Sequence, residues 1–173
     1  MRVLVTYASK HGSTKEIAQR IAFGLNERGV PADLQLINQV DVLDGYDGVV
    51  IGSAIYIGRW MKEATEFVER VIPALAGRRV FLFSSGPLGD LPGVDPPQIA
   101  ELMTSLKVVE HRLFAGTLRK DHLSLLERAV VKGVKAPYGD FRDWGEIDSW
   151  VASIVQHLYA PSATGRLASV NRS

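Results

Sequence analysis

The sequence contains no cysteine among its 173 residues. Disulfides, thiolate metal ligands, cysteine nucleophiles and cysteine-bound iron–sulfur clusters are therefore excluded. The histidines are scattered as His11, His111, His122 and His157, without the spacing that metal ligands show. We accordingly expect no metal site in this chain.

The sequence also lacks an excess of charge of either sign. It has 20 Lys and Arg against 19 Asp and Glu, which gives a formal net charge of +1. A nucleic-acid-binding protein usually has a clear basic excess on one face, so we expect no nucleic-acid partner. The composition also differs from the strongly acidic balance of a typical small electron carrier.

No apolar run approaches the length of about eighteen residues that a membrane-spanning helix requires. Residues 1–10, MRVLVTYASK, have the pattern of a β-strand and not that of a signal peptide. We therefore expect a cytoplasmic protein without a transmembrane segment.

Short apolar runs rich in β-branched or aromatic residues recur along the chain. Those at residues 3–7, 49–51 and 80–83 show little alternation, which is typical of strands buried on both faces of a parallel sheet. A weaker run at residues 33–37 alternates between apolar and polar residues, and we expect it at a sheet edge.

Helical periods separate these strands. Apolar residues recur three and four positions apart within residues 17–25, 64–75, 99–106 and 147–158. Strands that alternate with helices indicate βαβ units, and hence an α/β fold with a doubly wound parallel sheet. A chain of this length can bury one sizeable core, so we expect a single domain over residues 1–159. The tail, residues 160–173, is small, polar and aperiodic, and we expect it to be disordered.

The first strand leads into the loop Ser9-Lys10-His11-Gly12-Ser13-Thr14 and then into a helix. Ligands of such sheets bind outside the carboxyl ends of the strands, where a helix N-terminus offers unpaired backbone N–H groups to an anion. Ser9, Ser13 and Thr14 add hydroxyl groups, and Gly12 permits a tight turn. The loop is a candidate phosphate site. The alternative is an ordinary capped helix, because Ser13 and Glu16 have the spacing of a capping box.

This loop differs from other phosphate-binding motifs. The absence of Gly-Lys-Ser/Thr excludes a Walker loop, and the absence of G-x-G-x-x-G argues against NAD. The segment resembles the phosphate loop of flavodoxins, whose pattern is Thr/Ser-x-Thr-Gly-x-Thr. Ser9, Gly12 and Thr14 match it, and His11 replaces the middle threonine. His11 offers an N–H donor or, when protonated, a positive charge; an exposed loop histidine is the other interpretation. The resemblance implies FMN as cofactor and a five-stranded parallel sheet of order 2-1-3-4-5, with helices on both faces.

Two further segments resemble the flavodoxin loops that hold the isoalloxazine ring. The third strand ends as Gly52-Ser53-Ala54-Ile55-Tyr56-Ile57-Gly58-Arg59-Trp60, where flavodoxins usually have Gly-Ser-Pro-Thr-Tyr followed by a glycine. The resemblance implies that Tyr56 lies beside the ring and that Gly58 supplies a flexible peptide near its reactive nitrogen. The alternative is that Tyr56 only caps the strand and that Trp60 packs at the start of the next helix.

The fourth strand ends as Phe83-Ser84-Ser85-Gly86-Pro87-Leu88-Gly89-Asp90, whose small residues allow the backbone close to a flat ring. Taken alone, this segment is an ordinary turn-rich loop. Together with the other two loops it predicts one crevice. The cofactor-binding residues implied by the resemblance are Ser9, Lys10, His11, Gly12, Ser13, Thr14, Ala54, Ile55, Tyr56, Ile57, Gly58, Ser85, Gly86, Pro87, Leu88, Gly89 and Asp90.

Up to about Tyr159 the chain resembles one branch of the flavodoxin-like proteins, the menaquinone-dependent protoporphyrinogen dehydrogenases and their relatives. The similarity rests on Ser-Ala-Ile-Tyr-Ile-Gly in the ring loop and on Gly139-Asp140-Phe141-Arg142-Asp143-Trp144 before the last helix. Asp143 is also a good N-cap for a helix that begins at Trp144. Residues 123–138 correspond to the extra segment of that branch. They have the pattern of a short basic amphipathic helix, which either meets a membrane peripherally or packs on the sheet.

The resemblance leads to three functional hypotheses. The first is an FMN-dependent oxidoreductase similar to protoporphyrinogen IX dehydrogenase, with a quinone as acceptor. The second is an electron-transfer flavodoxin that serves a protein partner, and the third is a flavin-free binding or regulatory module on the same fold.

Cations beside the ring loop bear on the chemistry of a bound flavin. Arg59 would stabilise an anionic reduced flavin, so we expect a potential less negative than that of an acidic electron carrier. Arg59 and Trp60 are the candidate substrate contacts. No catalytic residue is identifiable, although His11 and Asp90 are titratable residues of the loops that could move a proton.

Overall fold

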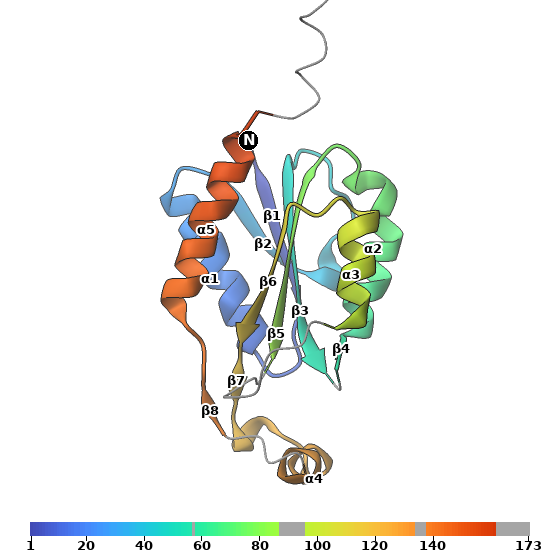
Figure 1. Cartoon of the computed structure of the whole chain (residues 1–173), viewed down its shortest axis with the longest axis vertical. Coiled ribbons are helices and arrows are strands. Elements are labelled where there is room, and N and C mark those ends of the chain that lie inside the picture. Colours follow the sequence, from blue (N-terminus) through green and yellow to red (C-terminus); the bar gives the residue numbers. More distant parts are fainter. Residues whose placement is uncertain (57, 87–95, 134–137, 162–173) are drawn as a thin grey trace, which may run out of the picture.

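Five parallel strands form the central sheet of the computed structural model, which describes residues 1–56, 58–86, 96–133 and 138–161 (Figure 1). Across the sheet they follow the order β2 (Ala32–Leu36), β1 (Val3–Ala8), β3 (Gly48–Tyr56), β5 (Arg79–Gly86) and β6 (Glu110–Ala115). Counted along the chain, this is the predicted order 2-1-3-4-5. The predicted flavodoxin-like fold class is confirmed.

The exposure of the strands follows their residue patterns. All six residues of β1 are buried, as are the first six of β3 and seven of the eight in β5. Strands without alternation are therefore those covered on both faces. The alternating strand β2 lies at the edge of the sheet and is only partly buried, as its pattern predicted.

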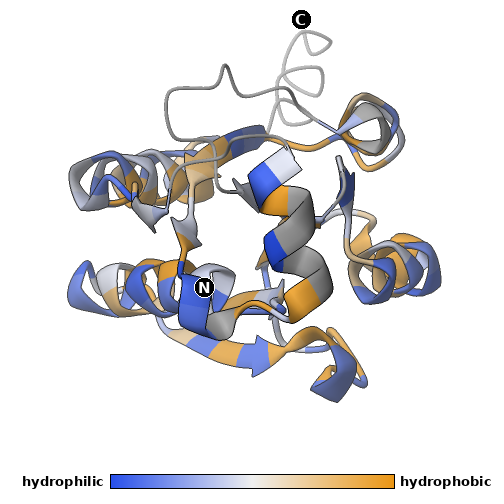
Figure 2. Ribbon diagram, turned by 90° about the horizontal axis from the view of Figure 1, so that it is seen from below, coloured by the Kyte–Doolittle hydropathy of each residue, from blue (hydrophilic) through white to orange (hydrophobic). Residues whose placement is uncertain are grey.

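Helices cover both faces of the sheet (Figure 1). On one face lie α1 (Ser13–Glu27) and α5 (Trp144–Tyr159), and on the other lie α2 (Lys62–Leu75) and α3 (Pro97–Ser105). Hydrophilic and hydrophobic residues share each of these helices (Figure 2), as expected for helices with one buried stripe. Under α1 and α5, the rings of Phe83, Phe114 and Trp150 pack together with centroids 5.5–6.2 Å apart.

Two short features add to the predicted architecture. The strand β4 (Arg59–Trp60) turns back antiparallel to the end of β3, so that Tyr56 lies opposite Arg59 and Ile55 opposite Trp60. The predicted ring loop thus includes a small hairpin. Strands of two residues are too short to show any period in sequence.

The second addition follows β6 and reaches to the start of α5. It consists of β7 (Thr117–Leu118), the 3-10 turn η2 (Lys120–His122), α4 (Leu125–Gly133) and β8 (Gly139–Asp140). Because β7 pairs antiparallel with β8, we call residues 117–143 the β7–β8 insertion. Its helix α4 lies beyond the carboxyl ends of the parallel strands (Figure 1) and confirms the helix predicted within residues 123–138.

Some expectations concern residues outside the described part of the chain. The tail from residue 162 belongs to these, so its predicted disorder and the domain limit at residue 159 stay predictions. Among the described residues, no helix has the length and apolar character needed to cross a lipid bilayer.

Candidate functional site

The three predicted loops meet at one edge of the sheet. The strands β1, β3 and β5 are parallel neighbours, with Ala8 opposite Ser53 and Ala54 opposite Ser85. Their carboxyl ends therefore bring Ser9 and the loop after it beside the ends of β3 and β5 (Figure 1). Ala54, Ile55, Tyr56 and Gly58 lie at this edge with Ser85 and Gly86. Ile57, Pro87, Leu88, Gly89 and Asp90 lie outside the described residues, and their flavin contacts stay predictions.

The phosphate loop has the backbone of an anion site. Gly12 is the N-cap of α1 and has a φ of 91°, in the region that glycine adopts without strain. Its N–H donates to Ser9 Oγ at 3.1 Å, and its carbonyl accepts from the N–H of Glu16 at 3.1 Å. In the described part of the chain, the N–H groups of Ser13, Thr14 and Lys15 find no acceptor. Three adjacent donors at a helix start fit a phosphate group.

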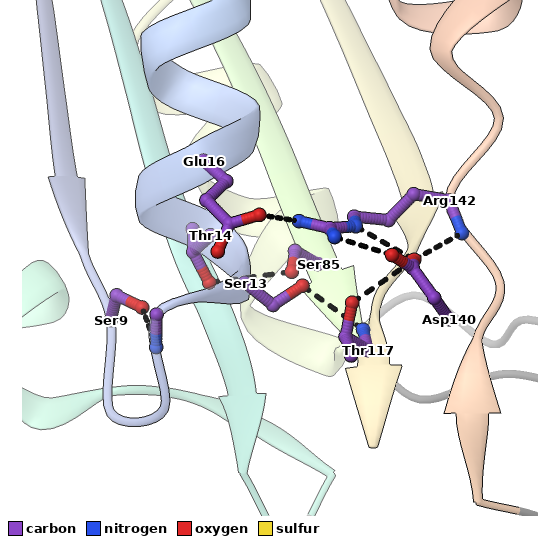
Figure 3. A network of polar contacts seen from close by, with 9 residues as sticks. Ser9, Ser13, Thr14, Glu16, Ser85, Thr117, Asp140 and Arg142 are labelled. Carbon is purple, nitrogen blue, oxygen red and sulfur yellow. Dashed lines mark hydrogen bonds and ion pairs between the residues drawn. The ribbon is translucent and has the colours of Figure 1, made fainter. Parts of the chain in front are cut away.

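The capping box is not formed, so that alternative is wrong. Among the described residues, no side chain caps α1. Ser13 Oγ instead accepts a hydrogen bond of 3.0 Å from the backbone N–H of Thr117. The Glu16 carboxylate pairs with Arg142 at 2.5 Å. Both residues of the local motif are thus engaged by the β7–β8 insertion (Figure 3).

The hydroxyl of Thr14 connects the phosphate loop to β5. Its side chain is buried, and Thr14 Oγ1 lies 3.3 Å from Ser85 Oγ. Gly116, which sequence reasoning missed, closes this region from the side of β6. Its N–H donates to Gly86 O at 2.5 Å, and an added Cβ would lie 3.0 Å from Gly86 O and 3.2 Å from Ser13 Oγ. The glycine directly after β6 was the available signal.

The ring loop presents cations around one aromatic side chain. Tyr56 is 39% exposed, and Lys10 Nζ lies 4.1 Å from the centroid of its ring. Arg59 is exposed on β4 opposite Tyr56. Gly58 has a φ of 72°, which the tight turn between the two requires. Lys10 was predicted for cofactor binding through the phosphate loop, and the structure places its ammonium over the ring-loop tyrosine.

Buried hydroxyl groups form hydrogen bonds with residues of the ring loop and of the segment directly after it. Trp60 is 4% exposed and its Nε1 donates to Ser84 Oγ at 2.8 Å, while Ser84 Oγ lies 3.0 Å from His111 Nε2. Ser53 Oγ accepts from the N–H of Met61 at 3.0 Å and donates to Ala54 O at 2.9 Å. The packing interpretation of Trp60 is correct. Its contact with a substrate stays a prediction.

A cavity of about 450 Å³ lies between the phosphate loop and the β7–β8 insertion. His11 and Ser13 line one side, and Arg119, Lys120 and Tyr138 line the other. The carboxylates at its wall are paired with arginines, Asp121 with Arg119 and both Glu16 and Asp140 with Arg142. Lys120 is the cation of this wall that has no ion pair among the described residues. Because the lining holds three carboxylates and three Lys or Arg side chains, Lys120 is the point at which this cavity can bind an anionic group.

Arg142 ties the insertion to α1. Its side chain is 8% exposed and lies 2.5 Å from Glu16 Oε2 and 2.5 Å from Asp140 Oδ2 (Figure 3). Its guanidinium carbon lies 4.6 Å from the ring centroid of Trp144. Hydrogen bonds from Arg142 lower the pKa of Asp140 to about 2, although partial burial opposes this, and Thr117 Oγ1 donates to the same carboxylate at 3.0 Å.

The start of α5 was predicted correctly. Asp143 is its N-cap, and Asp143 Oδ1 accepts from the N–H of Glu146 at 3.0 Å.

Comparison with known proteins identifies the group to which this arrangement is related. The family model of the flavodoxin domain matches residues 4–143. Protoporphyrinogen IX dehydrogenase (quinone) of Escherichia coli (strain K12) is 25% identical over 175 residues, which cover 91% of this chain and 96% of that protein. An uncharacterized protein of Methanocaldococcus jannaschii is 33% identical over 151 residues, which cover 86% of this chain and 85% of that protein.

Solved structures share the fold at low sequence identity. A flavodoxin from the domain Archaea superimposes with a TM-score of 0.65 at 16% identity, over 92% of this chain and 100% of that one. Oxidised flavodoxin 2 from Bacillus cereus gives a TM-score of 0.64 at 20% identity, over 91% and 99%.

Proposed function

This chain belongs to the flavodoxin domain family, and from that premise we propose that it binds FMN and acts as an FMN-dependent oxidoreductase. The uncapped start of α1 carries the proposal. The N–H groups of Ser13, Thr14 and Lys15 are adjacent, lack acceptors within the described residues, and lie beside the hydroxyls of Ser9, Ser13 and Thr14. A phosphate monoester would satisfy the three N–H donors at once and benefit from the helix dipole.

The remaining loops suit the rest of the cofactor. Tyr56 offers an exposed aromatic face, Gly58 a turn with positive φ, and Ser85 and Gly86 a narrow backbone at the end of β5. FMN would supply the transfer of one or two electrons. Lys10 and Arg59 place positive charge beside Tyr56, where the isoalloxazine ring would lie, and this charge favours an anionic reduced flavin. We therefore expect a potential less negative than that of acidic electron carriers.

For the substrate, we propose a porphyrinogen as electron donor and a quinone as acceptor. The similarity to the Escherichia coli enzyme over 91% of this chain supports this. So does the cavity beside the phosphate loop, where Lys120 has no ion pair among the described residues and can bind a carboxylate of a porphyrinogen. On α4, Leu125 is 82% exposed, which supports a peripheral contact between a cytoplasmic protein and the membrane in which quinones dissolve.

The test is to purify the protein, record its visible spectrum, titrate it with FMN, and follow protoporphyrinogen oxidation with and without a menaquinone analogue. We expect stoichiometric FMN and turnover that depends on the quinone. A colourless protein that takes up no FMN would contradict the flavin proposal and favour a flavin-free module on the same fold.

A second candidate is an electron-transfer flavodoxin with a protein partner. The fold similarity to flavodoxins over more than nine-tenths of this chain favours it. Its signature would be bound FMN that a reductase reduces and a partner protein reoxidises, without turnover of porphyrinogen. The near-neutral net charge of +1 argues for the enzyme, because carriers steer their partners with acidic surfaces.

A further inference from the structure

We propose that the β7–β8 insertion keeps the phosphate site open by preventing α1 from capping itself. This inference rests on the proposed binding of FMN. Two observations carry it together: Ser13 and Glu16 have the sequence spacing of a capping box, and each is held by a different residue of the insertion.

A formed capping box would compete directly with a phosphate. In that motif the glutamate carboxylate accepts a hydrogen bond from the serine N–H, and the serine hydroxyl accepts one from the glutamate N–H. The N–H of Glu16 already donates to Gly12 O, but the N–H of Ser13 is one of the donors that the phosphate needs. The Glu16 carboxylate would also place a negative charge at the helix start, where the phosphate binds. The two anions would then compete for the same favourable position at the helix dipole.

The insertion engages Ser13 through the main chain. The N–H of Thr117 donates to Ser13 Oγ at 3.0 Å, which occupies an acceptor position of that hydroxyl. The hydroxyl keeps its proton and can donate it to a phosphate oxygen. Thr117 thereby holds the Ser13 hydroxyl toward β7 and leaves its proton available to the site.

The insertion engages Glu16 through Arg142. This guanidinium bridges Glu16 on α1 and Asp140 on β8, and its side chain is almost fully buried against the ring of Trp144. Glu16 is thus drawn to the flank of α1 and its charge is compensated (Figure 3). Arg142 is a positioning residue, because it acts on the phosphate site through Glu16.

The chain offers a matched control for Arg142. Arg20 lies on the same helix as Glu16 and makes a bidentate ion pair with Asp148 on α5, with distances of 2.7 and 2.5 Å. This pair ties α1 to its neighbour in a similar way but leaves Ser13 and Glu16 untouched. Arg20→Met therefore reports the cost of losing an ion pair on α1, and Arg142→Met adds the release of Glu16.

The experiment is a calorimetric titration of the apoprotein with FMN and with riboflavin, which lacks the phosphate. We expect Arg142→Met to weaken FMN binding about tenfold and to leave riboflavin binding unchanged. Adding Glu16→Gln to Arg142→Met should restore most of the FMN affinity, because the charged competitor is gone. Arg20→Met should bind both ligands like the wild type.

Three results would overturn the inference: wild-type FMN affinity in Arg142→Met, equal weakening for riboflavin, or no recovery in the double variant. Should Arg142→Met fail to fold, Arg142→Lys serves in its place, since it keeps the charge but loses the bridging geometry. A wild-type protein that binds no FMN would refute the proposed function itself. Normal FMN binding in the wild type with no effect at Arg142 would refute only this inference.

Discussion

The proposed FMN site has a phosphate end and a ring end, which differ in the groups that they present to a ligand. At the phosphate end, main-chain N–H groups face the ligand, and the buried Thr14 and the closely packed Gly116 support them from behind. At the ring end, the exposed side chains of Lys10, Tyr56 and Arg59 do so, on a hairpin supported by buried residues. Buried groups and main chain fix where a ligand binds. Exposed charges instead change the redox potential of a bound flavin. We therefore expect the affinity for FMN to depend on the phosphate end and the redox potential to depend on the ring end.

The largest effect on affinity should come from filling the space beside Gly116. In Gly116→Val, the added Cβ would approach Gly86 O and Ser13 Oγ, which forces the end of β6 away from the phosphate loop. We expect FMN binding to weaken about a hundredfold in calorimetric titration. Gly133→Val is the control, since a Cβ at Gly133 meets no atom within 4 Å. Equal affinities in the two variants would contradict the close packing of Gly116.

A smaller effect should follow from removing a single hydroxyl at the phosphate end. Thr14→Val keeps the shape of the buried side chain and removes the hydroxyl that donates to Ser85 Oγ and so holds the start of α1 against β5. We expect about a tenfold loss of FMN affinity and little change for riboflavin. Thr65→Val on α2 controls for the chemical change. A parallel loss for both ligands would mean that Thr14 shapes the ring end as well.

The pH dependence of the phosphate end should be smaller still. Arg142 lowers the pKa of Asp140 from 3.8 to about 2 in the folded protein, so the charged form is favoured by folding. Its stabilisation is present above about pH 4 and is lost as the pH falls toward 2. Because Asp140 is 48% exposed, we expect less than about 1 kcal/mol. Acid unfolding followed by circular dichroism should show this loss in the wild type and not in Asp140→Asn.

The smallest effect on affinity should occur at the ring end. Lys10→Met and Arg59→Met each remove one exposed cation near Tyr56. We expect FMN affinity close to that of the wild type and a two-electron potential more negative by about 30 mV, measured by potentiometric titration. Arg70→Met is the control, since Arg70 lies over Phe67 on the remote helix α2. An unchanged potential in both ring-end variants would contradict the expectation that the ring end determines the redox potential.

The buried strands and the loop between the first strand and α1 could be predicted because both depend on local patterns, whereas the strand order came from the resemblance to flavodoxins. Apolar runs without alternation mark buried strands, and a hydroxyl-rich loop between strand and helix marks an anion site. The partners of Ser13 and Glu16 could not be predicted in this way. Thr117 and Arg142 lie 104 and 126 residues further along the chain, and their contacts override the local capping motif.

At the ring end, too, local sequence patterns could not predict the side-chain contacts, although the residues involved are closer in sequence. Lys10 belongs to the phosphate loop by sequence, yet its long side chain reaches the ring of Tyr56 at the end of the neighbouring strand β3. Trp60 could be assigned to a ligand or to the core by sequence alone. Its indole N–H donates to the buried Ser84 Oγ, and this hydrogen bond satisfies the polar group of a tryptophan that lies in the core.

The stacking of Arg142 on Trp144 gives the protein an internal optical reporter. Of its three tryptophans, Trp60 and Trp150 are 4% and 2% exposed, whereas Trp144 is 38% exposed. A collisional quencher such as iodide would therefore reach Trp144 far more readily than the other two. Because the guanidinium covers one face of this indole, the emission of Trp144 should change whenever Arg142 leaves this ring. A displacement of Arg142 can thus be followed in time without an added label.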